Sequence, residues 1–180
     1  KWFRQQALLQ FANRKDKSIV PRLTDILKTG SPDLALEALW AIHVSGGFSD
    51  NLAGIAMSHQ DPYVREWTVR LIGDKRKVSS ALAAKLATLA ANETNVIVRS
   101  QLAASSKRLA GSFAIPILKN LIINHDDSND PDIPLLIWWA IEAKAETDRD
   151  ALISVFADKK IWQKKLVQDV LLKRLMQRYI

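Results

Sequence analysis

A column of mostly apolar residues recurs along the whole chain at nearly constant spacing. Successive members lie 31, 30, 34 and 35 residues apart, and each is followed one helical turn later by a second, similar column. The two columns are Ala7, Ala38, Thr68, Leu102, Ile137 and Phe11, Ile42, Ile72, Ser106, Ile141. A period in this range is typical of stacked helix pairs, because each pair can bury its apolar face only against its neighbours. The sequence therefore predicts an all-α, right-handed α-solenoid of about five helix pairs plus a terminal helix.

Prolines and apolar periodicity place the expected helices. Pro21 and Pro116 lie 17 residues after Arg4 and Arg99, respectively. Proline suits the first turn of a helix, because it has a fixed φ and no N–H, so we expect each of these prolines to open the second helix of a pair. The expected helices span residues 2–13, 19–29, 33–45, 50–58, 62–73, 80–91, 95–110, 114–124, 133–145, 149–157 and 160–178.

Composition limits the kinds of site that the chain can hold. Its 180 residues, 48% of them hydrophobic, suffice for one continuous core, so we expect a single domain over residues 1–180. The absence of cysteine excludes disulfides, thiolate metal sites and covalent haem attachment within this segment. With no glycine-rich phosphate loop and no paired histidines, the sequence predicts no metal, no cofactor and no catalytic residue. The longest apolar run, nine residues from Ile133 to Ile141, is shorter than the roughly 20 that a membrane span needs.

A recurring helix signature stands at residues 61–74. The string Asp61-Pro62-Tyr63-Val64-Arg65, closing at Leu71-Ile72-Gly73-Asp74, resembles the HEAT repeat pattern of aspartate, proline, valine-arginine and a late glycine. Further segments extend the likeness over nearly the whole chain: Trp2-Phe3-Arg4, Ala38-Leu39-Trp40-Ala41-Ile42-His43, Asp132-Ile133-Pro134-Leu135-Leu136-Ile137-Trp138-Trp139-Ala140 and Arg174-Leu175-Met176. Together these segments are similar to the HEAT region of large membrane-bound dehydrogenases of planctomycete-type bacteria.

The resemblance implies the middle segment of a multidomain oxidoreductase, between a propeller similar to soluble sugar dehydrogenases and a c-type haem domain. It implies a periplasmic or cell-envelope location and a non-catalytic scaffold or spacer with a surface that docks a protein. The chain begins with Lys and ends within a helical pattern, which also leads us to expect a piece of a longer protein. It departs from the HEAT pattern at Ala35 and Pro134, which stand at arginine positions, and at Ser106, which stands at a core position.

Three arginines occupy the same place in their helices. Arg4, Arg65 and Arg99 each follow the first apolar residue of the first helix in a pair. Such a ladder could grip an acidic partner or a phosphate chain, but we expect it to bridge acidic or carbonyl groups of the adjacent repeat. Asp61 and Asp130 are then helix caps and ladder partners rather than catalytic acids.

Trp138 and Trp139 are adjacent on one expected helix. Neighbouring helical residues point about 100° apart, so the two rings do not enter the same seam. Either both are buried on two sides of a middle helix, or one is exposed and serves to stack on a sugar or base or to anchor a protein. Trp40, Trp67 and Trp162 each fit a single apolar stripe, and we expect them in the core.

The acidic stretch from Asp126 to Asp132 does not complete a calcium-binding loop. An EF-hand begun at Asp126 would need glycine in place of Pro131 and glutamate in place of Ile137. We therefore expect a solvated loop that caps the next helix.

Positive charge gathers at the C-terminal end of the chain. From Asp158 onward there are seven Lys or Arg and two Asp, which supply +5 of the net charge of +7. This basic patch consists of Lys159, Lys160, Lys164, Lys165, Lys173, Arg174 and Arg178. It is either the solvated face of a capping helix or a contact surface for phosphates, acidic lipid headgroups or an acidic domain.

The second helices of the pairs form the expected docking wall. Their outward polar residues are Arg22, Asp25, Lys28, Lys85, Lys119 and Asn120, and we expect a protein partner to rest on the concave surface that they line. Two alternatives remain open. One is a nucleic-acid-binding array, exemplified by the HEAT-like alkylpurine glycosylases, since the chain is basic and holds six tryptophans. The other is carbohydrate binding through Trp138 and Trp139.

Overall fold

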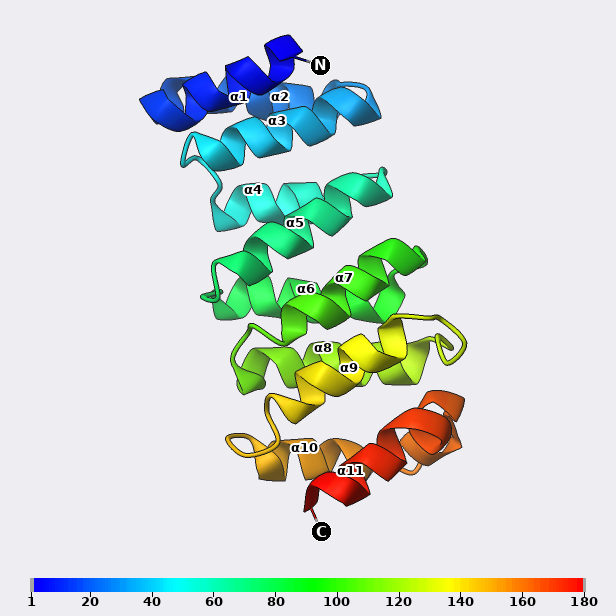
Figure 1. The fold of residues 1–180 in the computed structure, drawn as a ribbon. Coiled ribbons are helices and arrows are strands. Elements are labelled where there is room, and N and C mark those ends of the chain that lie inside the picture. Colours follow the sequence, from blue (N-terminus) through cyan, green and yellow to red (C-terminus); the bar gives the residue numbers. More distant parts are fainter. Residues whose placement is uncertain (1, 180) are drawn as a thin grey trace. The chain divides into compact units, whose positions relative to one another are not determined.

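The computed structural model describes residues 2–179, which form helices joined by short loops and include no strand (Figure 1). The expectation of an all-α chain is confirmed. The chain divides into two compact units, Lys1–Leu71 and Ile72–Ile180. The boundary lies inside the helix α5 (Pro62–Asp74) rather than in a linker.

The first unit is organised around α3. Its helices are α1 (Trp2–Arg14), α2 (Val20–Thr29), α3 (Pro32–Val44), α4 (Asp50–Met57) and most of α5, with a short 3-10 turn, Lys17–Ile19, before α2. Both α1 and α2 pack against α3. The partly buried rings of Trp40 on α3 and Trp67 on α5 stand edge-on, with centroids 5.1 Å apart. The buried apolar residues lie mainly on α3 and α4, whereas α1 contributes none.

Alternate helices pack on one another in the second unit. Its helices are α6 (Ser80–Asn92), α7 (Val96–Ser106), α8 (Gly111–Asn124), α9 (Ile133–Glu142), α10 (Arg149–Phe156) and α11 (Leu172–Tyr179). The helix α6 packs on α8 and α7 packs on α9, while α8 also contacts α7, α9 and α10. A π-helical stretch, Val167–Leu171, leads into α11 and contacts α9. The helices α6 to α10 therefore bury apolar residues against near neighbours in the sequence, whereas α11 has no buried residue.

The two apolar columns lie in the core at four of their five positions. Ala38, Thr68, Leu102 and Ile137 of the first column are buried, and so are the corresponding members of the second. The expectation was wrong at Ala7, which is exposed. The reason is that α1 has packing partners on one side only, so its periodic residues meet too few neighbours to be buried.

Pro116 lies inside α8, so the expectation that it opens a helix was wrong. The helix begins earlier, at Gly111, with Ala110 as the residue before it. At this depth proline leaves the carbonyl of Ser112 without a helical N–H donor, but Ser112 is exposed and water can reach it. Pro21 does stand in the first turn of α2.

The expected continuous helix over residues 160–178 is interrupted. A 3-10 turn, Ile161–Gln163, ends at Lys164, whose backbone is extended with φ −81° and ψ 126°. The indole N–H of Trp162 donates to the backbone oxygen of Phe156 at 2.7 Å and holds the turn against the end of α10. No glycine or proline marks this break, so apolar periodicity alone could not reveal it.

Candidate docking surfaces and the Arg99 clamp

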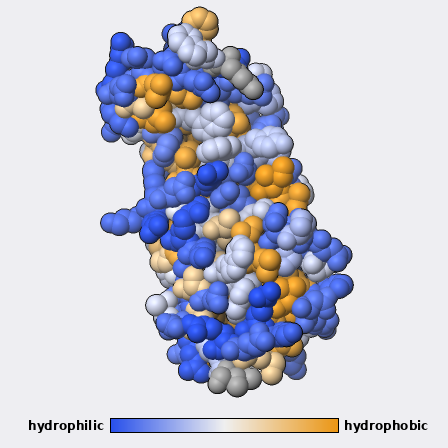
Figure 2. Space-filling model, in the orientation of Figure 1, coloured by the Kyte–Doolittle hydropathy of each residue, from blue (hydrophilic) through white to orange (hydrophobic). Residues whose placement is uncertain are grey.

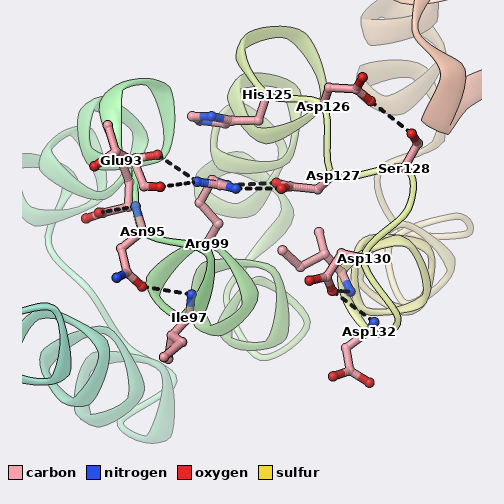
Figure 3. Close-up of polar contacts among 12 residues, drawn as sticks. Glu93, Asn95, Ile97, Arg99, His125, Asp126, Asp127, Ser128, Asp130 and Asp132 are labelled. Carbon is pink, nitrogen blue, oxygen red and sulfur yellow. Dashed lines mark hydrogen bonds and ion pairs between the residues drawn. The ribbon is translucent and has the colours of Figure 1, made fainter.

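Arg99 fastens two loops of the second unit through a buried ion pair (Figure 3). Its Nε and Nη2 donate to the two carboxylate oxygens of Asp127 at 2.7 and 2.5 Å, and its Nη1 donates to the backbone oxygens of Glu93 and Thr94 at 3.2 and 2.8 Å. The side chains of Arg99 and Asp127 are only 13% and 8% exposed. We call these four residues the Arg99 clamp. The hydrogen bonds that Arg99 donates to Asp127 raise the pKa of Arg99 above its ordinary value, so the guanidinium stays charged.

Arg65 fastens the loop before its own helix in the same way. Its Nη1 donates to the backbone oxygens of His59 and Gln60 at 2.8 and 2.9 Å, which are the residues six and five positions earlier, as for Arg99. The carboxylate of Asp61 in that loop accepts from the N–H groups of Tyr63 and Val64 and caps α5. The sequence pattern predicted contacts to the adjacent repeat and did not indicate this contact of Arg65 within its own loop.

Arg4, the third of these arginines, pairs with an acidic side chain of another helix. Its Nη1 lies 2.6 Å from Oε1 of Glu37 on α3, in an exposed ion pair. Arg4 pairs with Glu37 on α3, Arg65 donates to the loop before its own helix, and Arg99 donates both to the loop before its own helix and to Asp127 in the loop before α9.

The acidic stretch before α9 has two separate roles. Oδ1 of Asp130 accepts from the N–H groups of Asp132 and Ile133 at 2.9 and 2.8 Å, at the start of α9. Asp127 is buried instead. The expectation of a solvated loop was therefore wrong at Asp127, because the charge of Arg99 offsets the cost of removing that carboxylate from water.

Burial also perturbs Glu66 on α5, and this yields a pH-dependent prediction. Desolvation raises the pKa of Glu66 above its ordinary value of 4.5, and the nearby Arg70 lowers it by less. The folded chain therefore holds this proton to a higher pH than the unfolded chain does, and the ionised carboxylate costs stability at neutral pH. We expect Glu66→Gln to raise the melting temperature at pH 7, with the gain shrinking as the pH falls towards 4.

Melting curves of Glu66→Gln and the parent chain across this pH range provide the check. Glu142→Gln, at an exposed position on α9, is the matched control and should show no such pH-dependent gain. A gain for Glu66→Gln that is equal at pH 7 and pH 4 would contradict the assigned cause.

The neighbouring tryptophans of α9 have opposite environments. Trp138 is buried, with the guanidinium of Arg174 lying 5.9 Å from its ring centroid, whereas Trp139 is 45% exposed. The two rings therefore do not form one platform for a sugar. Trp162 is 40% exposed, so its expected place in the core was wrong. It lies in the turn after α10, where its ring stands edge-on to Phe156.

The polar residues of the expected docking wall fall in both units. Arg22 and Lys28 are exposed on α2 of the first unit. Lys85 is exposed on α6, and Lys119 on α8 lies 3.9 Å from a carboxylate oxygen of Asp158. The wall residues of the second unit are therefore not all free for a partner, because Lys119 already has an acidic neighbour.

The seven cations of the basic patch do not lie on one helix. Lys165 pairs with Asp169, Arg178 pairs with Glu146, and Arg174 lies over Trp138. The remaining four make no ion pair within residues 2–179: Lys159, Lys160, Lys164 and Lys173. Unpaired positive charge is thus concentrated at the turn before α11 and at its start.

An open apolar groove lies in each unit. The groove of the first unit, of about 570 Å³, lies among α1, α2 and α3, with the Arg4–Glu37 pair at its edge. The groove of the second unit, of about 310 Å³, lies between α10 and α11, and we call it the terminal groove. It is lined by Ile153 and Phe156 of α10, by Trp162, and by Leu172, Met176 and Tyr179 of α11. Figure 2 shows mostly hydrophilic residues on the visible face, with apolar residues in separate patches.

Lys144 is buried and its ammonium donates to the backbone oxygen of Lys107 at 2.9 Å, next to the end of α7; desolvation lowers the pKa of this lysine. Residues 2–179 include no cluster of three or more metal-ligating side chains. No helix in this range is both long and apolar enough to cross a membrane.

Comparison with known proteins gives no relative for this chain: no family model, no curated protein and no solved structure matches it.

Proposed function

We propose that the chain is a non-catalytic scaffold that holds a protein partner, and that its fold is a right-handed α-solenoid of HEAT-like helix pairs. The observation that supports this most is the packing order of the second unit, where α6 packs on α8 and α7 on α9. Helices that pack against near neighbours in sequence build an extended surface, and such surfaces are typical binding sites of solenoids. The scaffold acts through its shape, because it fixes the position of the protein partner that it binds.

The repeated arginine contact gives further support. Arg65 and Arg99 stand 34 residues apart and donate to carbonyls at the same two relative positions in the preceding loop. In a chain of related helix pairs, the same local contact is expected to recur one repeat length later.

The proposed setting is a multidomain oxidoreductase of the periplasm or cell envelope. Its support is the resemblance carried by residues 132–140 and the associated segments. In that setting the scaffold would hold a propeller domain and a c-type haem domain in a fixed arrangement.

The isolated chain is expected to bind a polypeptide that flanks it in its own gene product, and to turn over no substrate. Isothermal titration with the separately expressed flanking polypeptides tests the binding, and a dye-reduction assay with sugar substrates tests the turnover. Substrate oxidation by the isolated chain would overturn the proposal.

Nucleic acid is the second candidate partner, because four lysines near α11 have no ion pair within the described range. If these four lysines neutralise about four phosphates, the logarithm of the affinity for random duplex DNA should fall with log salt at a slope of about −3.6. Such binding at about 50 mM salt, without binding to the flanking polypeptides, would replace the protein-docking proposal.

A further inference from the structure

The terminal groove presents large apolar side chains to solvent. Ile153 and Met176 are 49% and 54% exposed and face the groove from α10 and α11. Trp162 is also exposed and lines the groove from the turn between these helices. Exposed apolar residues gathered around one concavity indicate a binding surface, whereas single exposed residues would need no explanation.

The shape of the terminal groove suits a helix. Its α11 side is formed by Leu172, Met176 and Tyr179, which stand one helical turn apart on one face. A helix that packs here would place its side chains between these rows, as helices do when ridges fit into grooves. Within the same unit, α8 covers α6 and α9 covers α7, so a helix is also the kind of element that this chain packs against its own helix pairs.

Positively charged side chains lie next to residues that line the terminal groove, in space or in sequence, and the exposed Asp150 stands beside Arg149 on α10. The guanidinium of Arg149 lies 5.4 Å from the ring centroid of Tyr179. Lys173 directly follows Leu172, and Lys160 lies two residues before Trp162; both are exposed and neither has an ion pair within the described range. A partner with acidic residues on either side of its apolar stripe would complement these cations.

We propose that the terminal groove docks an amphipathic helix of a protein partner, with an apolar stripe that enters the groove and Asp or Glu residues that face these neighbouring cations. This inference rests on the proposed scaffold function and names the chemistry of the partner. A concave groove with helical spacing fits discrete side chains, whereas a bilayer surface would need a flat or convex apolar face.

The probe is a labelled synthetic helix of about 18 residues, long enough to be partly helical in water. It carries Leu or Phe at positions i, i+3, i+7 and i+10, with Glu at the flanking positions. A matched peptide has Lys in place of every Glu. Fluorescence anisotropy is expected to show that the Glu peptide binds the 180-residue chain with a micromolar dissociation constant. The Lys peptide should bind at least about tenfold more weakly.

Variants locate the binding site. Met176→Asp places a carboxylate in the groove and should weaken binding of the Glu peptide by about tenfold or more, since both charge and lost apolar contact oppose it. Leu9→Asp makes the same kind of change at an exposed apolar residue of α1 and should leave the affinity unchanged. Lys173→Glu, at the exposed residue that follows Leu172, should also weaken binding, and it serves as the test should Met176→Asp fail to fold.

Several results would overturn the inference. These are equal binding of the Glu and Lys peptides, affinities that neither Met176→Asp nor Lys173→Glu alters, and binding to phosphatidylserine vesicles in place of the Glu peptide. Binding to a flanking polypeptide that Met176→Asp leaves intact would retain the scaffold function and reject this groove as its site.

Discussion

Replacing Arg99 with alanine is expected to lower the free energy of unfolding of the second unit by about 3 kcal/mol. The substitution leaves the carboxylate of Asp127 buried without its cation, and it also frees the carbonyls of Glu93 and Thr94. Breaking a buried pair costs more than the pair contributes, because the remaining charge is still cut off from water. Urea denaturation followed by circular dichroism measures this loss.

The matched control is Arg4→Ala. Arg4 occupies the equivalent helix position, but its pair with Glu37 is exposed, with the two side chains 60% and 27% accessible. The expected loss is therefore about 0–1 kcal/mol. Replacing both Arg99 and Asp127 with apolar residues should recover much of the stability that Arg99→Ala loses. Equal losses for Arg99→Ala and Arg4→Ala would show that the Arg99 clamp is not a buried pair.

Ile137→Ala is expected to cost about 2–5 kcal/mol. Ile137 is fully buried on α9, which packs against α7, so the substitution removes apolar contacts and leaves a cavity. The same urea titration of the variant and the parent chain provides the measurement.

Ile153→Ala on α10 is the control for this core substitution. Ile153 is about half exposed at the terminal groove, and its truncation should change the stability of the chain by less than about 1 kcal/mol. A larger loss for Ile153→Ala than for Ile137→Ala would mean that the repeating column does not form the core.

Local signals in the sequence were enough to predict most helices. Asp61 and Pro62 mark the start of α5, and the structure begins that helix at Pro62 with Asp61 capping it. The apolar columns identified buried positions such as Leu102 and Ile137, because apolar residues at helical spacing lie on the face of the helix that packs against its neighbours. These features depend on neighbours within a turn or within one repeat.

Features that depend on distant contacts were missed. The burial of Asp127 follows from Arg99, 28 residues away, and nothing in the acidic loop itself distinguishes Asp127 from Asp126. The helix break before α11 is stabilised by the hydrogen bond from the indole of Trp162 to Phe156, and no glycine or proline in the sequence indicates it. The terminal groove was missed as well. The pattern of α11 shows an apolar stripe, but whether another helix covers that stripe is a property of packing.

Methyl nuclear Overhauser contacts test most directly whether the helices of the second unit stack in sequence order. In a methyl-labelled sample, the leucine and isoleucine methyl groups of α6 should contact those of α8, and the methyl groups of α7 should contact those of α9. Contacts of α6 with α11 in place of α8, or of α7 with α10 in place of α9, would contradict the stacked arrangement and the scaffold function built on it.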